Sequence, residues 1–491
     1  MIKKILFVET ATPGVHIFSL FKMPRLGSLI LATILSKKGY KTKVILEEHK
    51  PLTREDINDF DAIAVSCLTS SAPRSYEIIK YAHELGKVVI AGGPHVTFEP
   101  EEALRSGADY VLKGEAEESL PALLEALNTK SSLDAISGLS YMKDDTFVHN
   151  KTEDFTLSLD DIPDPDFSLL DNDWQKGWMM KIIPVMTSRG CPFDCTFCTV
   201  TQMFGKKYRF MSPDRIIELV KKYNDSKHLL FFYDDNFTAN KKHSKELLNK
   251  MIAMNVQFKW IAQVRADIAE DAELLTLMKK AGCIKVFIGF ETVNPDALKN
   301  IKKGQTIQKM IDSVKKIHKA GISVHGMFIL GIPGDTIATM KNTVRFALKY
   351  KLESAQFLIL TPFPGTLEYK KYRDDNAIIL DDFSLYDTHH AVIKPTELSA
   401  SELQTMQIWA HKKFYSGFNT VIRLLTGKFV DAFVSIYASM ILKSWILTNK
   451  KYLNAIKDTS ASKVDFSLDH SFEDVHPDLK LPLLMRLFVK K

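Results

Sequence analysis

The sequence predicts an α/β protein in three parts: a doubly wound, Rossmann-like sheet, a partial (β/α)6 barrel, and a mainly α-helical carboxyl-terminal region. Two observations predict this. Short apolar runs of strand length alternate with longer helical patterns up to about residue 395, and the spacing of that alternation changes after residue 180. We therefore expect a first domain at 1–130, a linker at 131–180, a barrel at 181–395 and a helical region at 396–491.

The composition is that of a soluble globular protein. Hydrophobic residues make up 45% and charged residues 25% of the 491 residues. Five cysteines provide no disulfide framework and indicate a reducing, cytoplasmic compartment. The apolar run at the start of the chain ends at Glu9, so it predicts a strand and not a signal peptide. A net charge of +6 is modest for this length and indicates no nucleic-acid partner.

The first unit is predicted to be a parallel sheet with helices between its strands. Ligands of such sheets bind beyond the carboxyl ends of the strands, where this sequence places small and hydroxyl residues. The connector after it is polar, and its segment 160–167 contains prolines that break any helix. The predicted strands are 4–8, 42–46, 62–65, 88–91 and 110–112, and the predicted helices are 24–38, 75–85, 99–106 and 119–127.

The second unit repeats the strand–helix alternation six times. Six β/α units fit a partial barrel, whose active site would lie at the carboxyl ends of the strands. The predicted strands are 182–187, 228–233, 258–264, 285–290, 323–330 and 355–360, and the predicted helices are 214–224, 242–253, 271–280, 306–319 and 336–350.

A C-x3-C-x2-C motif, formed by Cys191, Cys195 and Cys198, follows the first barrel strand. A structural zinc site needs four protein ligands, so a zinc knuckle would have to recruit Cys67 or Cys283. A four-iron cluster on three thiolates instead leaves one iron with an open position, unlike the four-cysteine clusters that only carry electrons. The motif therefore predicts an iron–sulfur cluster that takes part in chemistry.

This spacing, with Phe197 directly before the last cysteine, resembles the signature of the radical S-adenosylmethionine (SAM) enzymes. The resemblance implies a [4Fe-4S] cluster bound by the three cysteines, which are then both metal ligands and catalytic. It also implies that the open iron chelates the amino and carboxylate groups of SAM. An electron, from a donor such as flavodoxin or ferredoxin, then cleaves SAM to a 5′-deoxyadenosyl radical.

The ends of the later barrel strands resemble the SAM-binding positions of that family. Tyr233, Asp234 and Asp235 follow the second strand and resemble the site for the SAM amino group. Gln263 and Arg265 end the third strand, where a guanidinium could pair with a carboxylate, and Glu291 ends the fourth, near the ribose. A structural cap or salt bridge is the alternative role for each acidic or basic residue of this group. The segment 361–366 is expected to close the barrel mouth and to border the substrate.

The first unit resembles the cobalamin-binding domain that precedes the cluster in class B radical SAM enzymes. The Asp-x-His-x-x-Gly motif, whose histidine ligates cobalt in some cobalamin proteins, is absent, so we expect a histidine-off cofactor. The alternative is a degenerate Rossmann-like domain that only covers the barrel or helps the chain to oligomerise. The contacts implied for cobalamin are Pro24, Leu26, Gly27, Ser66, Leu68, Thr69, Gly92, Gly93, Pro94, His95, Gly114 and Glu115.

Taken together, the resemblance implies a cobalamin-dependent radical SAM methyltransferase that methylates an unactivated carbon of a small molecule. A radical cyclisation or rearrangement, as in the anaerobic cyclase of chlorophyll synthesis, is the alternative within enzymes. A non-catalytic cobalamin sensor would leave the cysteine motif without a purpose. A methylthiotransferase would need a second cysteine triad ahead of the barrel, where the sequence has only Cys67.

The carboxyl-terminal region is basic and apolar. Residues 401–457 contain eight Lys and Arg against two acids. Within them, 429–447 predicts a helix with one narrow polar stripe at Asp431, Ser435, Ser439 and Lys443. Its uncharged run is shorter than the roughly 20 residues of a membrane span. We expect this helix to pack over the barrel mouth, with a membrane-surface role as the alternative, and we expect a hydrophobic or lipid-like substrate.

Overall fold

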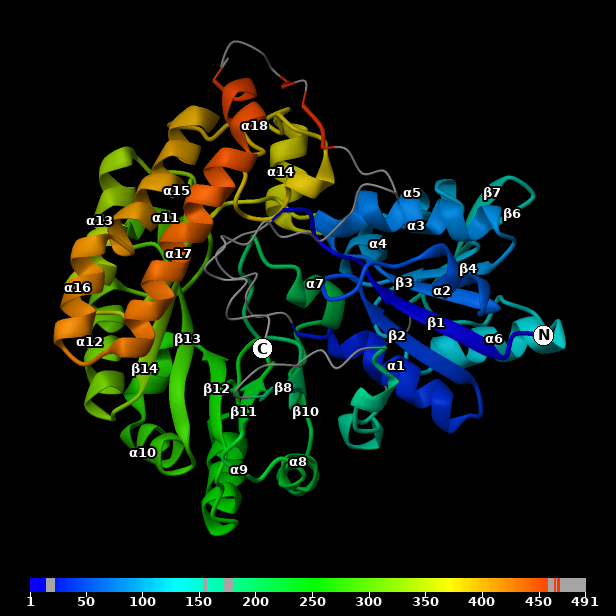
Figure 1. The fold of residues 1–491 in the computed structure, drawn as a ribbon, viewed down its shortest axis with the longest axis horizontal. Helices are drawn as coiled ribbons and strands as arrows, with labels where there is room; N and C mark the ends of the chain where they lie inside the picture. The colour runs from blue at the N-terminus through cyan, green and yellow to red at the C-terminus, as the bar shows by residue number, and fades with distance from the viewer. Residues whose placement is uncertain (15–22, 153–156, 172–180, 458–462, 465, 469–491) are drawn as a thin grey trace.

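The computed structural model describes residues 1–14, 23–152, 157–171, 181–457, 463, 464 and 466–468. Two α/β units lie side by side, the first in blue and cyan and the barrel in green (Figure 1). Helices of the carboxyl-terminal region, in orange, cover the far side of the barrel. The predicted fold class is confirmed.

The first unit is a seven-stranded sheet in the order β2-β1-β3-β4-β5-β6-β7. Its parallel strands are β1 (Lys4–Glu9), β2 (Lys41–Leu46), β3 (Ala62–Ser66), β4 (Val88–Gly92) and β5 (Tyr110–Leu112). The helices are α1 (Leu26–Lys37), α2 (Arg54–Asn58), α3 (Ala72–Glu84), α4 (Pro94–Phe98), α5 (Pro100–Arg105) and α6 (Ser119–Thr129). The helix predicted at 99–106 is α5, which Pro100 begins, while α4, directly before it, was not predicted.

The predicted linker contains two further strands of this sheet, which its polar composition did not indicate. β6 (Leu139–Lys143) pairs antiparallel with β5, and β7 (Thr146–His149) pairs antiparallel with β6. β7 is the edge strand and has no buried residue, so it lacks the apolar alternation on which strand prediction depends.

The second unit is a parallel six-stranded sheet in the order β15-β14-β13-β12-β11-β8, curled into a partial barrel. Its strands are β8 (Lys181–Val185), β11 (His228–Phe232), β12 (Lys259–Val264), β13 (Cys283–Glu291), β14 (Ser323–Leu330) and β15 (Ser354–Ile359). Its helices are α8 (Pro213–Lys221), α9 (Lys241–Ala253), α10 (Ala272–Lys280), α11 (Pro295–Asn300), α12 (Ile307–Lys319) and α13 (Ile337–Lys349).

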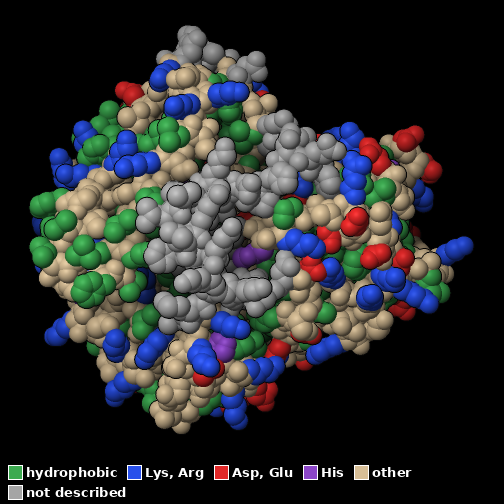
Figure 2. Space-filling view, in the orientation of Figure 1, with side chains coloured by type: hydrophobic (Ala, Val, Ile, Leu, Met, Phe, Trp, Pro, Cys, Tyr) green, Lys and Arg blue, Asp and Glu red, His purple; other side chains and the backbone are tan. Residues whose placement is uncertain are grey.

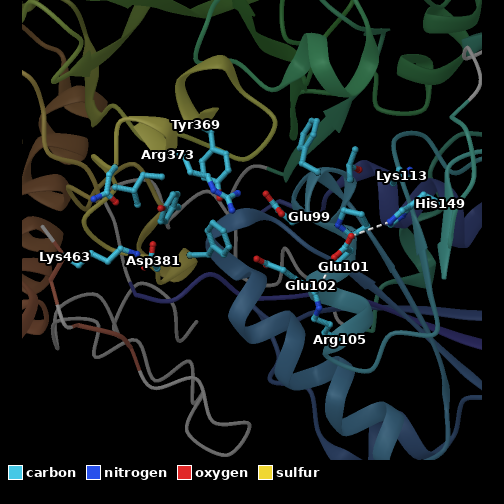
Figure 3. Close-up of a pocket in the computed structure, with 17 residues that line it drawn as sticks. Glu99, Glu101, Glu102, Arg105, Lys113, His149, Tyr369, Arg373, Asp381 and Lys463 are labelled. Atoms are coloured by element: carbon cyan, nitrogen blue, oxygen red, sulfur yellow. Dashed lines mark hydrogen bonds and ion pairs between the residues drawn. The ribbon is translucent and has the colours of Figure 1, made fainter. Parts of the chain in front are cut away.

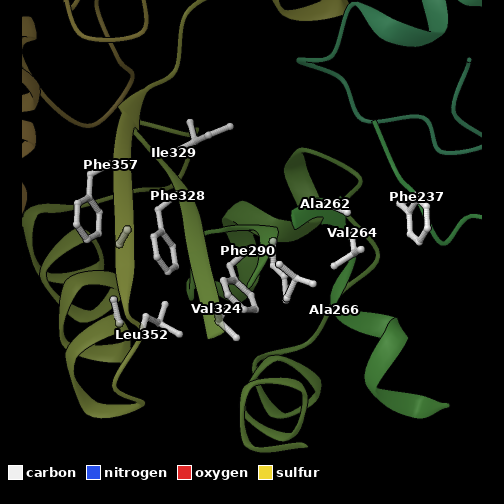
Figure 4. Close-up of a cluster of buried hydrophobic side chains, with 14 of the residues drawn as sticks. Phe237, Ala262, Val264, Ala266, Phe290, Val324, Phe328, Ile329, Leu352 and Phe357 are labelled. Carbon is white, nitrogen blue, oxygen red and sulfur yellow. The ribbon is translucent and has the colours of Figure 1, made fainter. Parts of the chain in front are cut away.

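The barrel core lies between this sheet and its helices. Phe290, Phe328 and Phe357 project from three neighbouring strands into one aromatic layer (Figure 4). Phe346 of α13 packs against the first two rings, with ring centroids 5.7 and 6.3 Å away. Successive side chains of a strand point to opposite faces, so the residues between these positions face the barrel interior.

The open edge of the barrel is covered by α15 (Ala400–Phe414). The hydroxyl of Tyr415, directly after this helix, donates to the Ala355 carbonyl at 2.6 Å and accepts from the Ala355 amide at 3.0 Å. An unpaired edge strand invites association with other chains. These bonds satisfy β15, the edge strand, at the position where a closed barrel would have another strand.

The remaining helices are α16 (Gly417–Leu425), α17 (Phe429–Thr448) and α18 (Lys450–Ala455). α17 does not lie over the barrel mouth. Asp431 approaches Lys285 to 3.9 Å, at the amino-terminal end of β13, while Trp445 packs on His390, which follows the carboxyl end of β15. α17 therefore runs along the side of the barrel, where it contacts α15 and α16.

The polar stripe predicted on α17 faces inward over part of its length. Ser435 is fully buried and bonded to Arg423 of α16, and the Ser439 hydroxyl donates to the Tyr415 carbonyl at 2.7 Å. α17 is long and apolar enough to span a membrane by length and composition alone, as no other helix of the described part is. Its packing against α15 and α16 buries one face of it within the protein.

Candidate active site

The cysteine motif lies in a loop between two short strands, β9 (Ser188–Arg189) and β10 (Arg209–Phe210), which pair with each other. The loop leaves the carboxyl end of β8, as predicted, and includes α7 (Val200–Phe204). Gly190, directly before the first cysteine, has φ +83°, and a Cβ atom there would lie 2.6 Å from the Lys207 carbonyl oxygen. Only glycine fits this position without displacing the backbone.

The three motif cysteines are half-buried. Burial raises the pKa of Cys191, and it raises that of Cys198 to about 12, so both are thiols at neutral pH in the metal-free protein. Metal ligation requires thiolates and therefore releases these protons.

The zinc alternative does not fit the described residues, where no three His, Cys, Asp or Glu side chains converge as a site for a single ion. Cys67 lies in the core of the first unit, and Cys283 begins β13, at the opposite end of the barrel from the motif. A four-iron cluster does not require the three thiols to converge on one ion, because each thiolate binds a different iron.

Asp234 and Asp235, after β11, have different surroundings. Asp234 is 1% exposed and accepts the backbone N–H groups of Thr187 (2.8 Å) and Ser188 (2.7 Å). It therefore fixes the chain that enters the cysteine loop, in the capping role that was the alternative for it. Asp235 is instead exposed to a cavity beside that loop, where the surrounding protein and the neighbouring Asp234 carboxylate raise its pKa to about 7.

Arg265 extends toward the cysteine loop. Its guanidinium carbon lies 3.6 Å from the ring centroid of Phe193, between the first two cysteines, and one terminal nitrogen donates to the Lys303 carbonyl at 2.8 Å. Its Nε atom is buried and has no hydrogen-bond partner among the described residues. A buried donor without a partner is costly, so this group suits an anionic ligand.

Glu291 forms a buried ion pair, the alternative role given for it, with a partner that the sequence did not indicate. It has φ +62°, at an irregularity in the pairing of β13 with β14, and its Oε1 atom accepts from Lys303 at 2.6 Å. The Lys303 ammonium lies 6.0 Å from the Phe197 ring centroid. Lys303 follows α11 in a basic loop that contains no recognisable motif. Only the fold therefore brings it to this site.

A cavity of about 460 Å³ lies between the two units, at the carboxyl ends of both sheets. From the first unit it is lined by turns after β3, β4 and β5 and by the start of α1, and it continues along the face of the sheet. From the barrel it is lined by the residues after the cysteine motif and by the ends of β11 and β12. We call it the central cavity. The predicted site residues that line it are Leu26, Gly27, Ser66, Leu68, Gly92, Gly93, Pro94, Gly114, Glu115, Tyr233, Asp235 and Gln263.

Three residues proposed for cobalamin do not line the central cavity: Pro24, Thr69 and His95. His95 is fully buried, and its ring nitrogens lie 3.4 Å from the Thr69 hydroxyl and 3.3 Å from Glu102. Its ring also packs on Phe383, with centroids 4.7 Å apart. His95 thus belongs to a contact between the first unit and the chain that follows the barrel.

Buried ion pairs join the two units at the central cavity. Arg189 donates to Glu115 at 2.7 Å and also pairs with Glu117, while Arg209 pairs with Glu115 as well. All four side chains are at most 11% exposed. Because Arg189 stands two residues before Cys191, this network fixes the cysteine loop relative to the strand ends of the first unit.

The segment after β15 also supports the cysteine loop. The Thr196 hydroxyl donates to Glu368 at 2.7 Å, from α14 (Leu367–Asp374). Gly365, just before this helix, packs on Phe98 of the first unit, because a Cβ atom there would lie 2.4 Å from that ring. The predicted closing segment 361–366 therefore contacts the first unit.

A larger cleft, of about 940 Å³, opens on the other side of α14 (Figure 3). Glu99, Glu101 and Glu102 of the first unit face Tyr369 and Arg373 across it. It is strongly polar, and none of the predicted site residues lines it. The central cavity, next to the cysteine loop, is therefore the candidate active site.

Comparison with known proteins agrees with this geometry. The model of the radical SAM superfamily matches residues 185–347, and that of the B12-binding domain matches residues 17–124. The chain belongs to the cobalamin-binding radical SAM enzymes. An uncharacterised methyltransferase of Pyrococcus horikoshii is 32% identical to this radical SAM enzyme over 80% of this chain and 88% of that protein. The cobalamin-dependent radical SAM enzyme OxsB, solved with aqua-cobalamin and SAM, has a similar fold (TM-score 0.65, 16% identity, 91% of this chain and 75% of that chain).

Relatives with named substrates include two kinds of reaction. Bacteriochlorophyllide d C-12(1)-methyltransferase of Chlorobaculum tepidum is 28% identical (82% of this chain, 84% of that protein). Hopanoid C-3 methylase of Methylococcus capsulatus is 24% identical (81% and 77%). An anaerobic magnesium-protoporphyrin IX monomethyl ester cyclase of Cereibacter sphaeroides is 27% identical (72% and 60%).

The cofactors of this radical SAM enzyme are a [4Fe-4S] cluster, SAM and cobalamin, as predicted. The residues present fit all three. The three thiols lie on one loop, and the unsatisfied guanidinium nitrogen of Arg265 lies beside it. Gly27 and Gly92 line the central cavity, and a Cβ atom at Gly27 would meet no described atom within 4 Å, which leaves room for a large ligand.

Proposed function

We propose that this enzyme methylates an unactivated carbon of a hydrophobic, lipid-like metabolite. The observation that carries the proposal is that one cavity is lined both by the strand ends of the first unit and by residues next to the cysteine loop. When bound, the cofactors supply hydrogen-atom abstraction from carbon and transfer of a methyl group. A substrate held in that cavity would reach both units without leaving the protein.

The residues of the chain divide this work between them. Cys191, Cys195 and Cys198 would hold the cluster. Arg265 would pair with the SAM carboxylate, and the Glu291–Lys303 pair would position polar groups of SAM beside Phe197. Asp235, Tyr233 and Gln263 line the cavity between them and would contact SAM or substrate.

Cobalamin would occupy the part of the central cavity that belongs to the first unit. Gly27 leaves space at its mouth, and apolar side chains of the sheet and of α1, such as Phe7, Ile30 and Ala64, line its depth. Because both His95 nitrogens have partners elsewhere, a cofactor without a histidine ligand remains our expectation.

The inner face of the barrel supports an apolar substrate. Phe231, Phe287, Met327 and Leu358 alternate with core residues and are half-buried on the side away from the helices. The rings of Phe231 and Phe287 lie with centroids 5.8 Å apart. An apolar substrate gains roughly 25 cal/mol for each Å² that it buries there. Relatives that act on bacteriochlorophyllide and hopanoids support the same substrate class.

Radical cyclisation is the second candidate, and the similarity to the anaerobic cyclase favours it. Both reactions begin with removal of a hydrogen atom, and the site described above serves either. The mass of the product distinguishes them, since methylation adds one methylene unit and cyclisation removes hydrogens.

The test has two stages. Anaerobically reconstituted protein, supplied with a flavodoxin or ferredoxin system as electron donor, should contain one four-iron cluster and convert SAM to 5′-deoxyadenosine. Cys195→Ala should lose both properties. Comparison of metabolites from intact and deletion strains should then reveal a product one methylene heavier. A stable zinc content with no iron-dependent absorbance, or a product that lacks hydrogens, would contradict the proposal.

A further inference from the structure

The helical hairpin formed by α16 and the first half of α17 (residues 417–436) exposes an unusual amount of apolar surface. Of the eighteen large apolar side chains that are exposed in the described part of the chain, nine belong to this hairpin. Leu425, Phe418 and Val430 are 82%, 75% and 73% exposed, so they project from the body of the protein. Soluble monomers rarely expose so many neighbouring apolar side chains unless a ligand, a partner or a membrane binds there.

The hairpin is well anchored on its other side, so the exposed residues are not the result of a poorly packed element. Arg423 bonds to Ser435 across the hairpin and lies over the rings of Phe414 and Tyr415, 5.0 and 5.7 Å from their centroids. The polar groups of both helices therefore face inward and the apolar groups outward. This arrangement is the reverse of the one expected for a helix pair facing water.

Lysines lie around the exposed apolar surface of the hairpin. Lys428 forms the turn between the helices, and Lys412 and Lys413 are exposed directly before α16, where the Asn419 side chain donates to the Lys413 carbonyl at 3.0 Å. Both oxygens of Glu353 are occupied, by Lys428 at 2.8 Å and by His318 at 3.1 Å. The latter contact places the end of α12 beside the turn, with its exposed Lys315, Lys316 and Lys319.

The acidic residues near the hairpin do not offset the positive charge of these lysines. Glu353 is buried and paired with Lys428 and His318, and Asp431 faces Lys285 with only 13% of its side chain exposed. Residues 401–457 contain eight Lys and Arg against two acids. Figure 2 shows hydrophobic side chains gathered at the left of the molecule, where Figure 1 places α16, with lysines and arginines above and below them.

We propose that this hairpin docks the enzyme on an anionic membrane surface. The exposed apolar side chains of the hairpin, among them Phe418, Leu425, Phe429 and Val430, enter the boundary between headgroups and acyl chains, and the lysines contact the headgroups. A groove on a partner protein would accommodate the apolar residues but would leave the lysine surplus without a counter-charge. Anionic lipid accounts for both features. Docking is independent of the reaction, so this inference does not rest on the proposed function.

Sedimentation with vesicles tests the proposal on the full, reconstituted protein. We expect it to bind vesicles of phosphatidylcholine with phosphatidylglycerol, and to bind much less to phosphatidylcholine alone. Leu425→Glu and Phe429→Glu should each weaken binding at least tenfold, and Leu425→Ser, which adds no charge, should weaken it as well. The combined change Lys412→Glu and Lys413→Glu should remove the preference for anionic vesicles. Met142→Glu, on β6 of the first unit and 45% exposed, makes the same charge change at a distant site and should bind as the unchanged protein does.

Four results would overturn the proposal. They are an unchanged protein that stays in the supernatant at low salt, equal binding by the Leu425 variants, equal binding to both kinds of vesicle, and a dimer in gel filtration that Leu425→Ser converts to a monomer without any vesicle binding. The last would make the hairpin a contact between two copies. Unchanged thermal midpoints of the variants would establish that they are folded, as the exposure of the replaced side chains leads us to expect.

Discussion

Gly27 allows the central cavity to be filled without disturbing the fold. It is the second residue of α1, it lines the cavity, and a Cβ atom there would have no neighbour within 4 Å in the part of the chain that the structure describes. Gly27→Phe places an aromatic ring, which can bury roughly 150–250 Å² of surface, at the mouth of a cavity of about 460 Å³. If cobalamin occupies this cavity, the two compete for the same space.

The expected magnitudes differ between two glycines of the same cavity. Gly27→Ala should raise the free energy of unfolding by up to about 1 kcal/mol, because glycine is the poorer helix residue. Gly93→Ala should lower it by at least about 2 kcal/mol. Gly93 has φ +103° and ψ 176°, a region costing other residues roughly 1–3 kcal/mol, and its Cβ atom would lie 2.7 Å from the Cys67 carbonyl oxygen. Bulk at Gly93 would thus disturb the backbone before it blocked a ligand.

Equilibrium dialysis against cobalamin, combined with urea unfolding, separates these effects. Gly27→Phe should unfold at a urea concentration close to that of the unchanged protein but retain at least tenfold less cobalamin, a difference of about 1.4 kcal/mol. Gly27→Ala is the matched control and should retain cobalamin in full. A folded Gly27→Phe protein that binds cobalamin as tightly as the control would refute the assignment of this cavity.

Three further changes test the contacts around the site. Glu117→Gln removes one charge from the network of ion pairs that joins the two units. The iron content should be unchanged, while the amount of methylated product formed per 5′-deoxyadenosine should fall. If that amount is unaltered, the network does not position the two units for the reaction. Lys303→Met leaves Glu291 buried without its cation and should cost about 3 kcal/mol of unfolding free energy and weaken SAM binding. Lys302→Met, at the adjacent and exposed position, is the matched control and should do neither. Although burial opposes ionisation of Glu353, hydrogen bonds from His318, Lys428 and a backbone amide hold its pKa at about 2, against an ordinary value of 4.5. Its contribution, about 3 kcal/mol, is therefore complete above pH 4.5 and is lost as the pH falls toward 2, and urea unfolding of Glu353→Gln should lack this part of the pH dependence.

The sequence alone determined the cofactor chemistry and most of the fold. The cysteine spacing is a local property, so it indicated a three-thiolate cluster without knowledge of the fold. The barrel strands are continuous apolar runs because both faces of a parallel sheet are covered, and β14 (Ser323–Leu330) has the bounds predicted for it. Ser66 and Gly92 stand in turns after strands, where ligands of parallel sheets bind, and both line the central cavity. Gly27, which the resemblance to cobalamin-binding domains implied, lines it as well.

Only the tertiary structure decided which polar residues meet. Arg189 and Glu117 are separated by 72 positions, and Lys303 reaches Glu291 through a loop whose composition is unremarkable. Pairing of this kind depends on distances between elements, which no local pattern contains. Helical periodicity likewise defined the two faces of α17 but not which of them points inward. Because Arg423 and the Tyr415 carbonyl supply partners for Ser435 and Ser439, the polar stripe turned toward the protein and left the apolar residues of the hairpin outside.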